Sequence, residues 1–175
     1  MTKSYRDLKD SIRDIPDFPK KGILFKDITT LLTRGDLFRK VIDEFAEHYQ
    51  GKKIQKIVGI ESRGFLFGSA LAYKLGAGIV PVRKKGKLPH KTVAATYQLE
   101  YGTDTLEMHA DALEPGMRVL VVDDLLATGG TSKATAELVK KVGGIITGYA
   151  FLIELLFLKG RENLNGYEIY SLIQY

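Results

Sequence analysis

The sequence of 175 residues has no cysteine, three histidines and no run of about eighteen consecutive apolar residues. Without cysteine the chain can form neither disulfides nor thiolate metal sites, which suits a reducing cytosol. The histidines, His48, His90 and His109, lack the spacing of metal ligands, so we expect no zinc site. The N-terminal stretch MTKSYRDLKDSIRDIPDFP is charged and lacks the apolar core of a signal peptide. We therefore expect a cytoplasmic protein that binds no membrane.

Internal repeats, low-complexity tracts and Pro/Gly/Ser-rich linkers are also absent from the sequence. The hydrophobic fraction of 45% is sufficient for a real core. We predict a single domain over residues 1–175. Within it we distinguish an N-terminal hood and base-binding segment over 1–33, a core over 34–160 with a flap near 86–108, and a C-terminal segment over 161–175.

The composition is basic, with a formal net charge of +5 and a pI of about 9.2. Such a balance is typical of proteins that bind nucleic acid or another acidic ligand. Part of the excess lies in one run, RKKGKLPHK over 83–91, which holds five Lys and Arg residues and no acid. Runs of this kind also occur in loops that charge simply keeps solvated. The place of this run, directly after a predicted strand, favours ligand binding.

Strand-like and helix-like segments alternate along most of the chain. The predicted elements are a strand over 54–60, a helix over 65–75 ended by Gly76, a strand over 78–82, a strand over 119–123, a helix over 131–142 ended by Gly143 and Gly144, and a strand in 145–155. This alternation is typical of a mainly parallel sheet with helices on its faces. We predict a doubly wound α/β fold.

The N-terminal third has a weaker pattern. Residues 6–15 read as a short helix closed by Pro16 and Pro19, and GILFKDITTLL reads as an irregular half-apolar piece. Asp36 is expected to cap a longer helix. Its apolar residues at helical spacing are Leu37, Val41, Ile42, Phe45 and Tyr49.

One segment departs from the strand and helix alternation. In TVAATYQLEY every second residue is apolar or aromatic, and DTLEMH continues this period after Gly102. A period of two on both sides of a glycine indicates an antiparallel two-stranded flap. A flap beside a basic loop suggests a lid.

Three motifs follow predicted parallel strands: ESRG, RKKGK and DDLLATGGT. They should meet at one edge of the sheet, because ligands of open α/β folds bind outside the carboxyl ends of the strands. The run Ala127–Thr131 offers successive main-chain N–H groups before a helix, which favours a bound phosphate. Asp123 and Asp124 would repel that phosphate, so they should face sugar hydroxyls or a divalent cation, with unequal roles for the two acids. The pattern describes a ribose that carries a 5-phosphate.

Two other nucleotide sites are excluded by missing motifs. The magnesium strand of P-loop proteins requires GxxxxGK[ST], which is absent from this sequence. A dinucleotide fold requires GxGxxG after its first strand, and GIESRGFLFG does not supply it.

VLVVDDLLATGGT resembles the phosphoribosyl-pyrophosphate signature of the type I phosphoribosyltransferases. The resemblance is strongest to the members of that family that use adenine, and it extends along the chain from DFPKKGILFKDIT to SLIQY. The stretches that carry it are SRGFLFG, RKKGKLP, LEYG and LKGRENL. The resemblance implies a small N-terminal hood and a flexible flap on the predicted fold. It implies transfer of the 5-phosphoribosyl group from 5-phosphoribosyl 1-pyrophosphate to adenine, giving AMP and pyrophosphate in purine salvage. It further implies Mg²⁺ as cofactor and a homodimer.

Substitution at the anomeric carbon needs groups that neutralise the leaving pyrophosphate and hold the sugar. Arg63 is a catalytic candidate because a planar guanidinium suits phosphate oxygens, although an arginine here could also be a simple surface residue. Residues expected to bind phosphoribosyl pyrophosphate are Ser62, Arg63, Arg83, Lys84, Lys87, Asp123, Asp124, Ala127, Thr128, Gly129, Gly130 and Thr131. We expect Mg²⁺ to be held mainly by pyrophosphate and ribose hydroxyls, with Asp123 or Asp124 as the candidate protein ligand.

The resemblance implies further roles. It places a cis peptide between Glu61 and Ser62, and it makes Glu100 the second catalytic candidate, which handles the proton of the attacking base. The alternation predicts Glu100 and Tyr101 at the flap tip. A glutamate in such a turn is often just solvated. Adenine is expected to meet main-chain groups of Leu24 and Lys26 and to stack on Phe25.

Two alternatives remain open. One is a regulator of this fold that binds nucleic acid through its basic charge, but the sequence leaves no helix-turn-helix segment outside the core and the basic run lies at the active edge. We therefore expect no nucleic-acid partner. The other is an enzyme of this fold that acts on a different base, and the residues alone do not distinguish adenine from guanine or hypoxanthine.

Overall fold

The computed structural model describes residues 4–98 and 102–175, and its main feature is a seven-stranded sheet. The sheet order is β5 (Thr92–Gln98), β6 (Thr103–His109), β4 (Gly78–Lys84), β3 (Lys56–Ile60), β7 (Arg118–Leu126), β8 (Ile145–Glu154) and β9 (Ile169–Gln174). Five neighbouring strands of this order pair in parallel: β4, β3, β7, β8 and β9. Strands β5 and β6 pair antiparallel at one edge. The prediction of a mainly parallel α/β sheet is confirmed.

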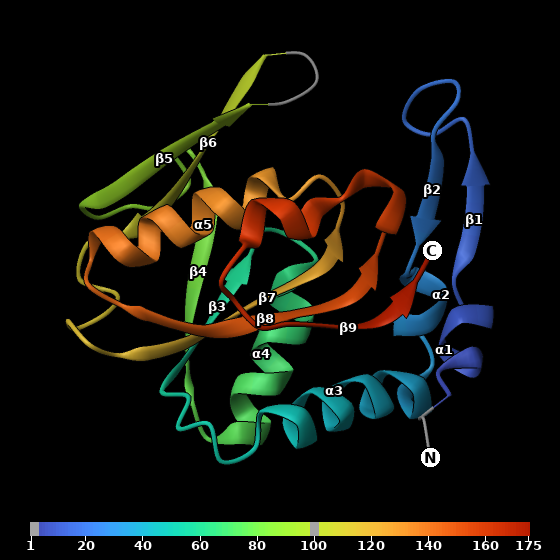
Figure 1. The fold of residues 1–175 in the computed structure, drawn as a ribbon, viewed down its shortest axis with the longest axis horizontal. Coiled ribbons are helices and arrows are strands. Elements are labelled where there is room, and N and C mark those ends of the chain that lie inside the picture. The colour runs from blue at the N-terminus through green and yellow to red at the C-terminus, as the bar shows by residue number, and fades with distance from the viewer. Residues whose placement is uncertain (1–3, 99–101) are drawn as a thin grey trace.

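Helices cover both faces of this sheet (Figure 1). Helices α3 (Gly35–Tyr49) and α4 (Gly64–Leu75) lie on one face, and α5 (Gly130–Lys141) lies on the other. Residues of β7 alternate between the two sides, as expected for a strand that is buried on both faces. Leu120 and Val122 pack in the core under α3 and α4, whereas Val119 and Val121 pack under α5.

The strand order reverses between β3 and β7. From β3 the chain passes through α4 to β4 on one side, and it later returns to β7 on the other side of β3. At such a reversal the connecting loops separate and leave a crevice at the carboxyl ends of the strands. The fold therefore places the ligand edge at the ends of β3 and β7.

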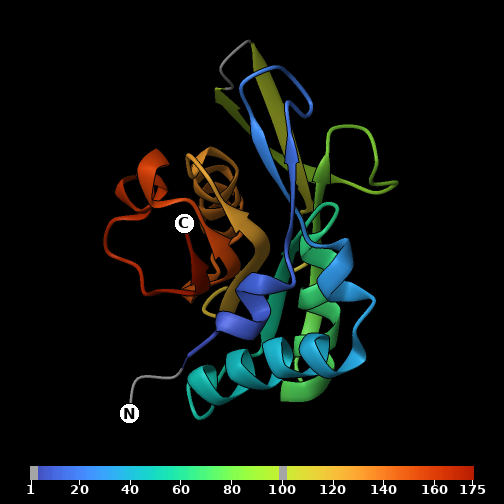
Figure 2. The same cartoon turned by 90° about the vertical axis from the view of Figure 1, so that its right-hand side faces the viewer.

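Two hairpins rise from the same end of the molecule (Figures 1 and 2). One is the predicted flap, β5 and β6, whose antiparallel register runs from Thr92↔His109 to Gln98↔Thr103. The other is the hood, β1 (Arg13–Pro16) paired with β2 (Leu24–Asp27). The flap is joined to the main sheet, because β6 pairs with the last two residues of β4.

The structure corrects the reading of the N-terminal third. Helix α1 spans Arg6–Asp10, and residues 13–15, predicted as its continuation, form β1 together with Pro16 instead. The half-apolar piece is regular, with β2 followed by α2 (Thr29–Leu32). Pairing with β2 outweighs the local helix preference over 13–15, because a strand partner satisfies the main-chain groups that a short isolated helix satisfies poorly.

The helix predicted after residue 35 is confirmed as α3, and all five of its named apolar residues are buried. Asp36 is not its cap: it lies in the first turn, and its carboxylate contacts Arg34 at 2.9 Å. The end of α4 at Gly76 is confirmed, with that glycine in the left-handed region at φ 66°.

Two strands extend past their predicted ends. Strand β4 continues through Arg83 and Lys84, and β7 continues through both acids to Leu126. Strand β9 was not predicted at all. Beyond the sheet, two 3₁₀ turns, η1 (Leu156–Leu158) and η2 (Gly160–Leu164), connect β8 to β9.

No helix within 4–98 or 102–175 combines the length and apolar character that a bilayer span requires.

Candidate active site

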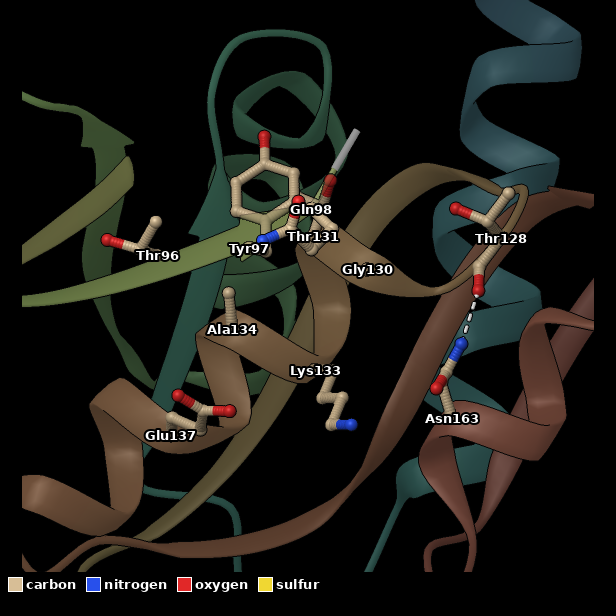
Figure 3. A pocket seen from close by; sticks show the side chains of 10 residues that line it. All are labelled: Thr96, Tyr97, Gln98, Thr128, Gly130, Thr131, Lys133, Ala134, Glu137 and Asn163. Atoms are coloured by element: carbon tan, nitrogen blue, oxygen red, sulfur yellow. Dashed lines mark hydrogen bonds between the residues drawn. The ribbon is translucent and has the colours of Figure 1, made fainter. Parts of the chain in front are cut away.

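The predicted phosphate loop connects β7 to α5. Gly129 is the N-cap of α5 with φ 82°, a conformation that favours glycine, and Gly130 opens the helix. Thr128, Gly130 and Thr131 line a cavity of about 560 Å³ together with Tyr97 and Gln98 of the flap (Figure 3). The loop and the flap strand therefore border the same space at the N-terminus of α5.

The loop packs directly against η2. A Cβ atom added at Gly129 would lie 2.5 Å from the Gly160 carbonyl oxygen and 3.2 Å from Asn163 Cβ. The Asn163 side-chain amide donates a hydrogen bond of 2.8 Å to the Thr128 carbonyl (Figure 3). Glycines at both contact points allow the two backbones to approach this closely.

Two buried acids precede the loop. Asp123 and Asp124 are 9% and 6% exposed, and both lie beyond the last residue of β7 that pairs with β3, Val122. The Asp124 main-chain N–H donates to Asp123 Oδ1 at 2.9 Å. Asp124 Oδ2 lies 2.8 Å from Arg63 Nη2, an ion pair without the alignment of a hydrogen bond. The two carboxylates thus have different partners.

Burial controls the protonation of this pair. Desolvation raises the pKa of Asp123 well above its ordinary value, and the neighbouring Asp124 charge raises it further. Desolvation also raises the pKa of Asp124, but the Arg63 guanidinium opposes that change. Arg63 therefore helps to keep one negative charge at the edge of the site.

Arg63 links the acid pair to the hood. It is the N-cap residue of α4, directly after the turn that follows β3, and its side chain is 32% exposed. Its guanidinium carbon lies 5.1 Å from the centre of the Phe25 ring, within the range of a cation–π contact. The cis peptide expected between Glu61 and Ser62 is confirmed, and Ser62 is exposed.

Gly64 lies against the acid-bearing strand. A Cβ atom there would lie 2.8 Å from Asp123 Oδ1 and 2.9 Å from the Val122 carbonyl oxygen. Only a residue without a side chain lets α4 begin this close to β7, so Gly64 contributes to the position of both Asp123 and Arg63.

The basic run is paired with acids that the sequence reasoning missed. Glu61 contacts Lys87 Nζ and lies 3.3 Å from Arg83 Nε, and it accepts the Lys84 main-chain N–H at 3.0 Å. Although burial alone raises its pKa, these contacts lower the pKa of Glu61 below the ordinary value. The Lys84 side chain instead contacts Asp104 of the flap at 3.0 Å. The three predicted cations therefore lie around Glu61 and Asp104 of the flap.

The predicted base-binding residues lie on β2. Leu24 is half exposed, and Phe25 contacts Phe18 edge-on with ring centres 5.1 Å apart. The Lys26 ammonium lies 2.6 Å from Asp14 and 3.7 Å from the centre of the Tyr175 ring. Its side chain is therefore held by the hood and the end of β9.

The site contains too few acids to hold a metal alone. Among the residues that the structure describes, no group of three or more His, Asp or Glu side chains could surround an ion. Asp123 and Asp124 supply carboxylate oxygens of the kind Mg²⁺ prefers, so a bound cation would take its other ligands from substrate and water.

Comparison with known proteins identifies this arrangement. The family model described as "Phosphoribosyl transferase domain" matches residues 27–161. The chain is 63% identical to the adenine phosphoribosyltransferase of Syntrophotalea carbinolica over 97% of this chain and 99% of that protein. This chain belongs to the adenine phosphoribosyltransferase family.

Solved structures of this phosphoribosyltransferase family share the whole fold. The adenine phosphoribosyltransferase of Thermoanaerobacter pseudethanolicus superposes with a TM-score of 0.96 at 55% identity, covering 98% of this chain and all of that one. The Saccharomyces cerevisiae enzyme, complexed with D-2,5-dideoxy-2,5-imino-altritol 1,6-bisphosphate and adenine, has a TM-score of 0.91 at 46% identity. It covers 95% of this chain, and 97% of its own length is matched. The resemblance seen in the sequence is confirmed, and the protein is a pentosyltransferase of purine salvage.

The sequence-predicted site of this phosphoribosyltransferase is largely brought together. Arg63, the acid pair and the phosphate loop lie at the ends of β3 and β7, and the basic residues lie at the end of β4. Glu100 and Tyr101, predicted for proton handling and for the flap tip, lie outside the described residues. Sequence reasoning missed Glu61, Gly64, Gly160 and Asn163 as parts of the site; the quoted LKGRENL was the available signal for the last two.

Asp123→Asn is expected to raise stability near pH 7 while it lowers turnover. A carboxyl whose folded-state pKa is raised contributes most stability below its ordinary pKa of 3.8, and this contribution is lost as the pH rises through the folded-state pKa. The neutral amide removes that loss, so the free energy of unfolding should rise and depend less on pH. Turnover should fall about 10- to 100-fold, the effect of a lost hydrogen bond to a charged group. Urea unfolding between pH 4 and 8 and initial rates measure both, with Asp111→Asn, whose side chain is 73% exposed, as control. A less stable variant would contradict the assignment of burial as the dominant effect.

Proposed function

We propose that this enzyme transfers the 5-phosphoribosyl group of 5-phosphoribosyl 1-pyrophosphate to adenine, giving AMP and pyrophosphate. The observation that carries the proposal is the buried acid pair, which lies between Arg63 and the predicted phosphate loop where the strand order of the sheet reverses. Curated relatives at about 60% identity over nearly the whole chain carry this activity in their names. The yeast relative was solved with adenine and a bisphosphate, which supports the same two subsites here.

The loop residues are proposed to hold the 5-phosphate. Main-chain N–H groups of Ala127–Thr131 and the N-terminus of α5 favour an anion, and the two threonine hydroxyls add donors. Asp123 and Asp124 then accept hydrogen bonds from the ribose hydroxyls. The acids lie on the strand before the loop, so a single ribose 5-phosphate spans both groups.

Arg63 is proposed to stabilise the leaving pyrophosphate. When N9 of adenine bonds to C1 of the ribose, the bond from C1 to the pyrophosphate oxygen breaks and its electron pair leaves with that oxygen. A fixed guanidinium stabilises the charge that develops there. Arg83, Lys84 and Lys87 supply further positive charge once the pyrophosphate competes with Glu61 and Asp104 for them.

Adenine is proposed to stack on Phe25 and to contact main-chain groups of Leu24 and Lys26 on β2. Lys26 is held through its side chain by Asp14 and Tyr175, so its main chain is fixed at the hood. Glu100 is proposed to accept the N9 proton of the attacking adenine; this role stays a prediction.

Mg²⁺ is proposed as the cofactor, held mainly by pyrophosphate and ribose hydroxyls, with Asp123 or Asp124 as protein ligand. When bound, it neutralises negative charge on the pyrophosphate. A homodimer and a cytoplasmic location, both predicted from the sequence and its resemblance, complete the proposal.

Pyrophosphate release with adenine, guanine, hypoxanthine and uracil in turn tests the proposed reaction. We expect turnover with adenine and at least about 100-fold lower kcat/KM with the oxopurines, because a site built for an amino group leaves polar groups unpaired against a carbonyl. Turnover with another base would reassign the substrate. Absence of turnover with all four bases, at saturating phosphoribosyl pyrophosphate and Mg²⁺, would favour the regulator.

A further inference from the structure

Beyond the reacting groups, the structure contains a buried carboxylate that the proposed reaction does not use. Glu154 ends β8, and its side chain is 3% exposed. Arg161 of η2 forms an ion pair with both of its oxygens, with the Nη2 contact at 2.6 Å. The Ser171 hydroxyl on β9 also donates to it. A buried charge with this many partners holds η2 firmly against the end of β8 and against the edge strand β9.

The element fixed in this way lies directly under the phosphate loop. A Cβ atom on Gly160 would overlap the Ala127 carbonyl oxygen, and it would lie 2.9 Å from Leu126 Cδ1. Gly129 makes the reciprocal close approach to Gly160. Three residues beyond Gly160 in η2, Asn163 donates its side-chain N–H to the Thr128 carbonyl at 2.8 Å. The loop backbone is thus held at successive residues by one short turn.

The Asn163 hydrogen bond fixes the direction of a neighbouring amide. In a planar trans peptide the carbonyl and the following N–H point in opposite directions. Because the Thr128 carbonyl points at η2, the Gly129 N–H of the same peptide points away from η2. If the Thr128 carbonyl turned over, that N–H would turn toward η2 with it.

We propose that Asn163 and Gly160 are positioning residues that hold the loop amides in the orientation that binds the 5-phosphate, with the Arg161–Glu154 ion pair as their anchor. This inference rests on the proposed function of the loop. It assigns a role to LKGRENL, which carries none of the reacting groups. The expected signature is a defect confined to the phosphorylated sugar, because no adenine contact is proposed for η2.

The test compares Asn163→Ala with Asn163→Gln, which retains an amide donor, and with Glu162→Ala, an exposed neighbour in the same turn. Asn163 is itself exposed, so its substitution should leave folding intact. Calorimetry with ribose 5-phosphate alone should show about tenfold weaker binding for Asn163→Ala, the loss of one hydrogen bond to the loop. KM for phosphoribosyl pyrophosphate should rise in parallel while KM for adenine and Tm stay unchanged. Asn163→Gln should recover part of the affinity, and Glu162→Ala should resemble the unsubstituted protein.

Gly160→Ala provides a second arm, because its added methyl group pushes on the Ala127 carbonyl rather than removing a bond. Its ribose 5-phosphate affinity, measured well below its own Tm, should fall by at least as much. Unchanged affinity in both variants would overturn the inference and leave the proposed function intact. Equal rises in the two KM values would also overturn it. No ribose 5-phosphate binding by the unsubstituted protein would overturn the proposed function and this inference together.

Discussion

Arg63→Ala is expected to lower kcat/KM by about 100- to 1000-fold, the effect of removing a preorganised group that stabilises developing charge. Arg63 is the proposed partner of the leaving pyrophosphate, and it contacts both Asp124 and the Phe25 ring. Its removal also takes away the charge that opposes the raised pKa of Asp124. The acid limb of the pH–rate profile should therefore move to higher pH.

Arg63→Lys is the matched variant for this prediction. It keeps the charge but loses the planar fork, so it should recover only part of the rate. Pyrophosphate release at saturating adenine, followed from pH 5 to 9, measures both effects. If Arg63→Ala kept a rate within about twofold of the unsubstituted enzyme, a change no larger than that of a neutral surface substitution, the catalytic assignment would be wrong.

Gly129→Val is expected to weaken binding of phosphoribosyl pyrophosphate by about 100-fold or more. Two costs combine at this position. The backbone φ of 82° is strained for any residue with a side chain, at about 1–3 kcal/mol, and a valine Cβ would lie 2.5 Å from the Gly160 carbonyl oxygen. The loop must move away from η2, which disturbs the amides that are proposed to bind the 5-phosphate.

Gly116→Val separates the two costs. Gly116 has nearly the same φ, 83°, but a Cβ atom there would meet nothing within 4 Å. Both variants should lose stability in thermal melts, and only Gly129→Val should lose affinity for ribose 5-phosphate by calorimetry. Equal affinity in the two variants would place the phosphate elsewhere.

Local patterns predicted most of the core correctly. The aliphatic run before the acids is buried on both faces as β7, and the helical spacing from Leu37 to Tyr49 appears intact in α3. Gly76 ends α4 as expected, since a left-handed residue stops a helix in any tertiary context. These features depend on neighbours in the chain, so the sequence contains enough information for them.

Pairing with distant segments explains the errors. Residues 13–16 form a strand because β2 supplies hydrogen-bond partners, and β4 and β7 extend past their predicted ends because β6 and β8 continue beside them. Strand β9 gains its place from β8. A strand is stabilised by its partner more than by its own residues, so its limits depend on which segments meet.

The sequence by itself determined which chemistry is proposed: small residues before a helix predict a phosphate site, paired acids predict a sugar site, and basic residues with Arg63 predict a site for a leaving anion. Tertiary structure alone decided which charges are paired and what supports them. Glu61 holds the basic run, Arg63 contacts Asp124, and Gly160 and Asn163 lie under a loop more than thirty residues earlier in the chain. Burial shifts the acids' pKa values and close packing selects glycine, and both effects arise only when distant segments come into contact.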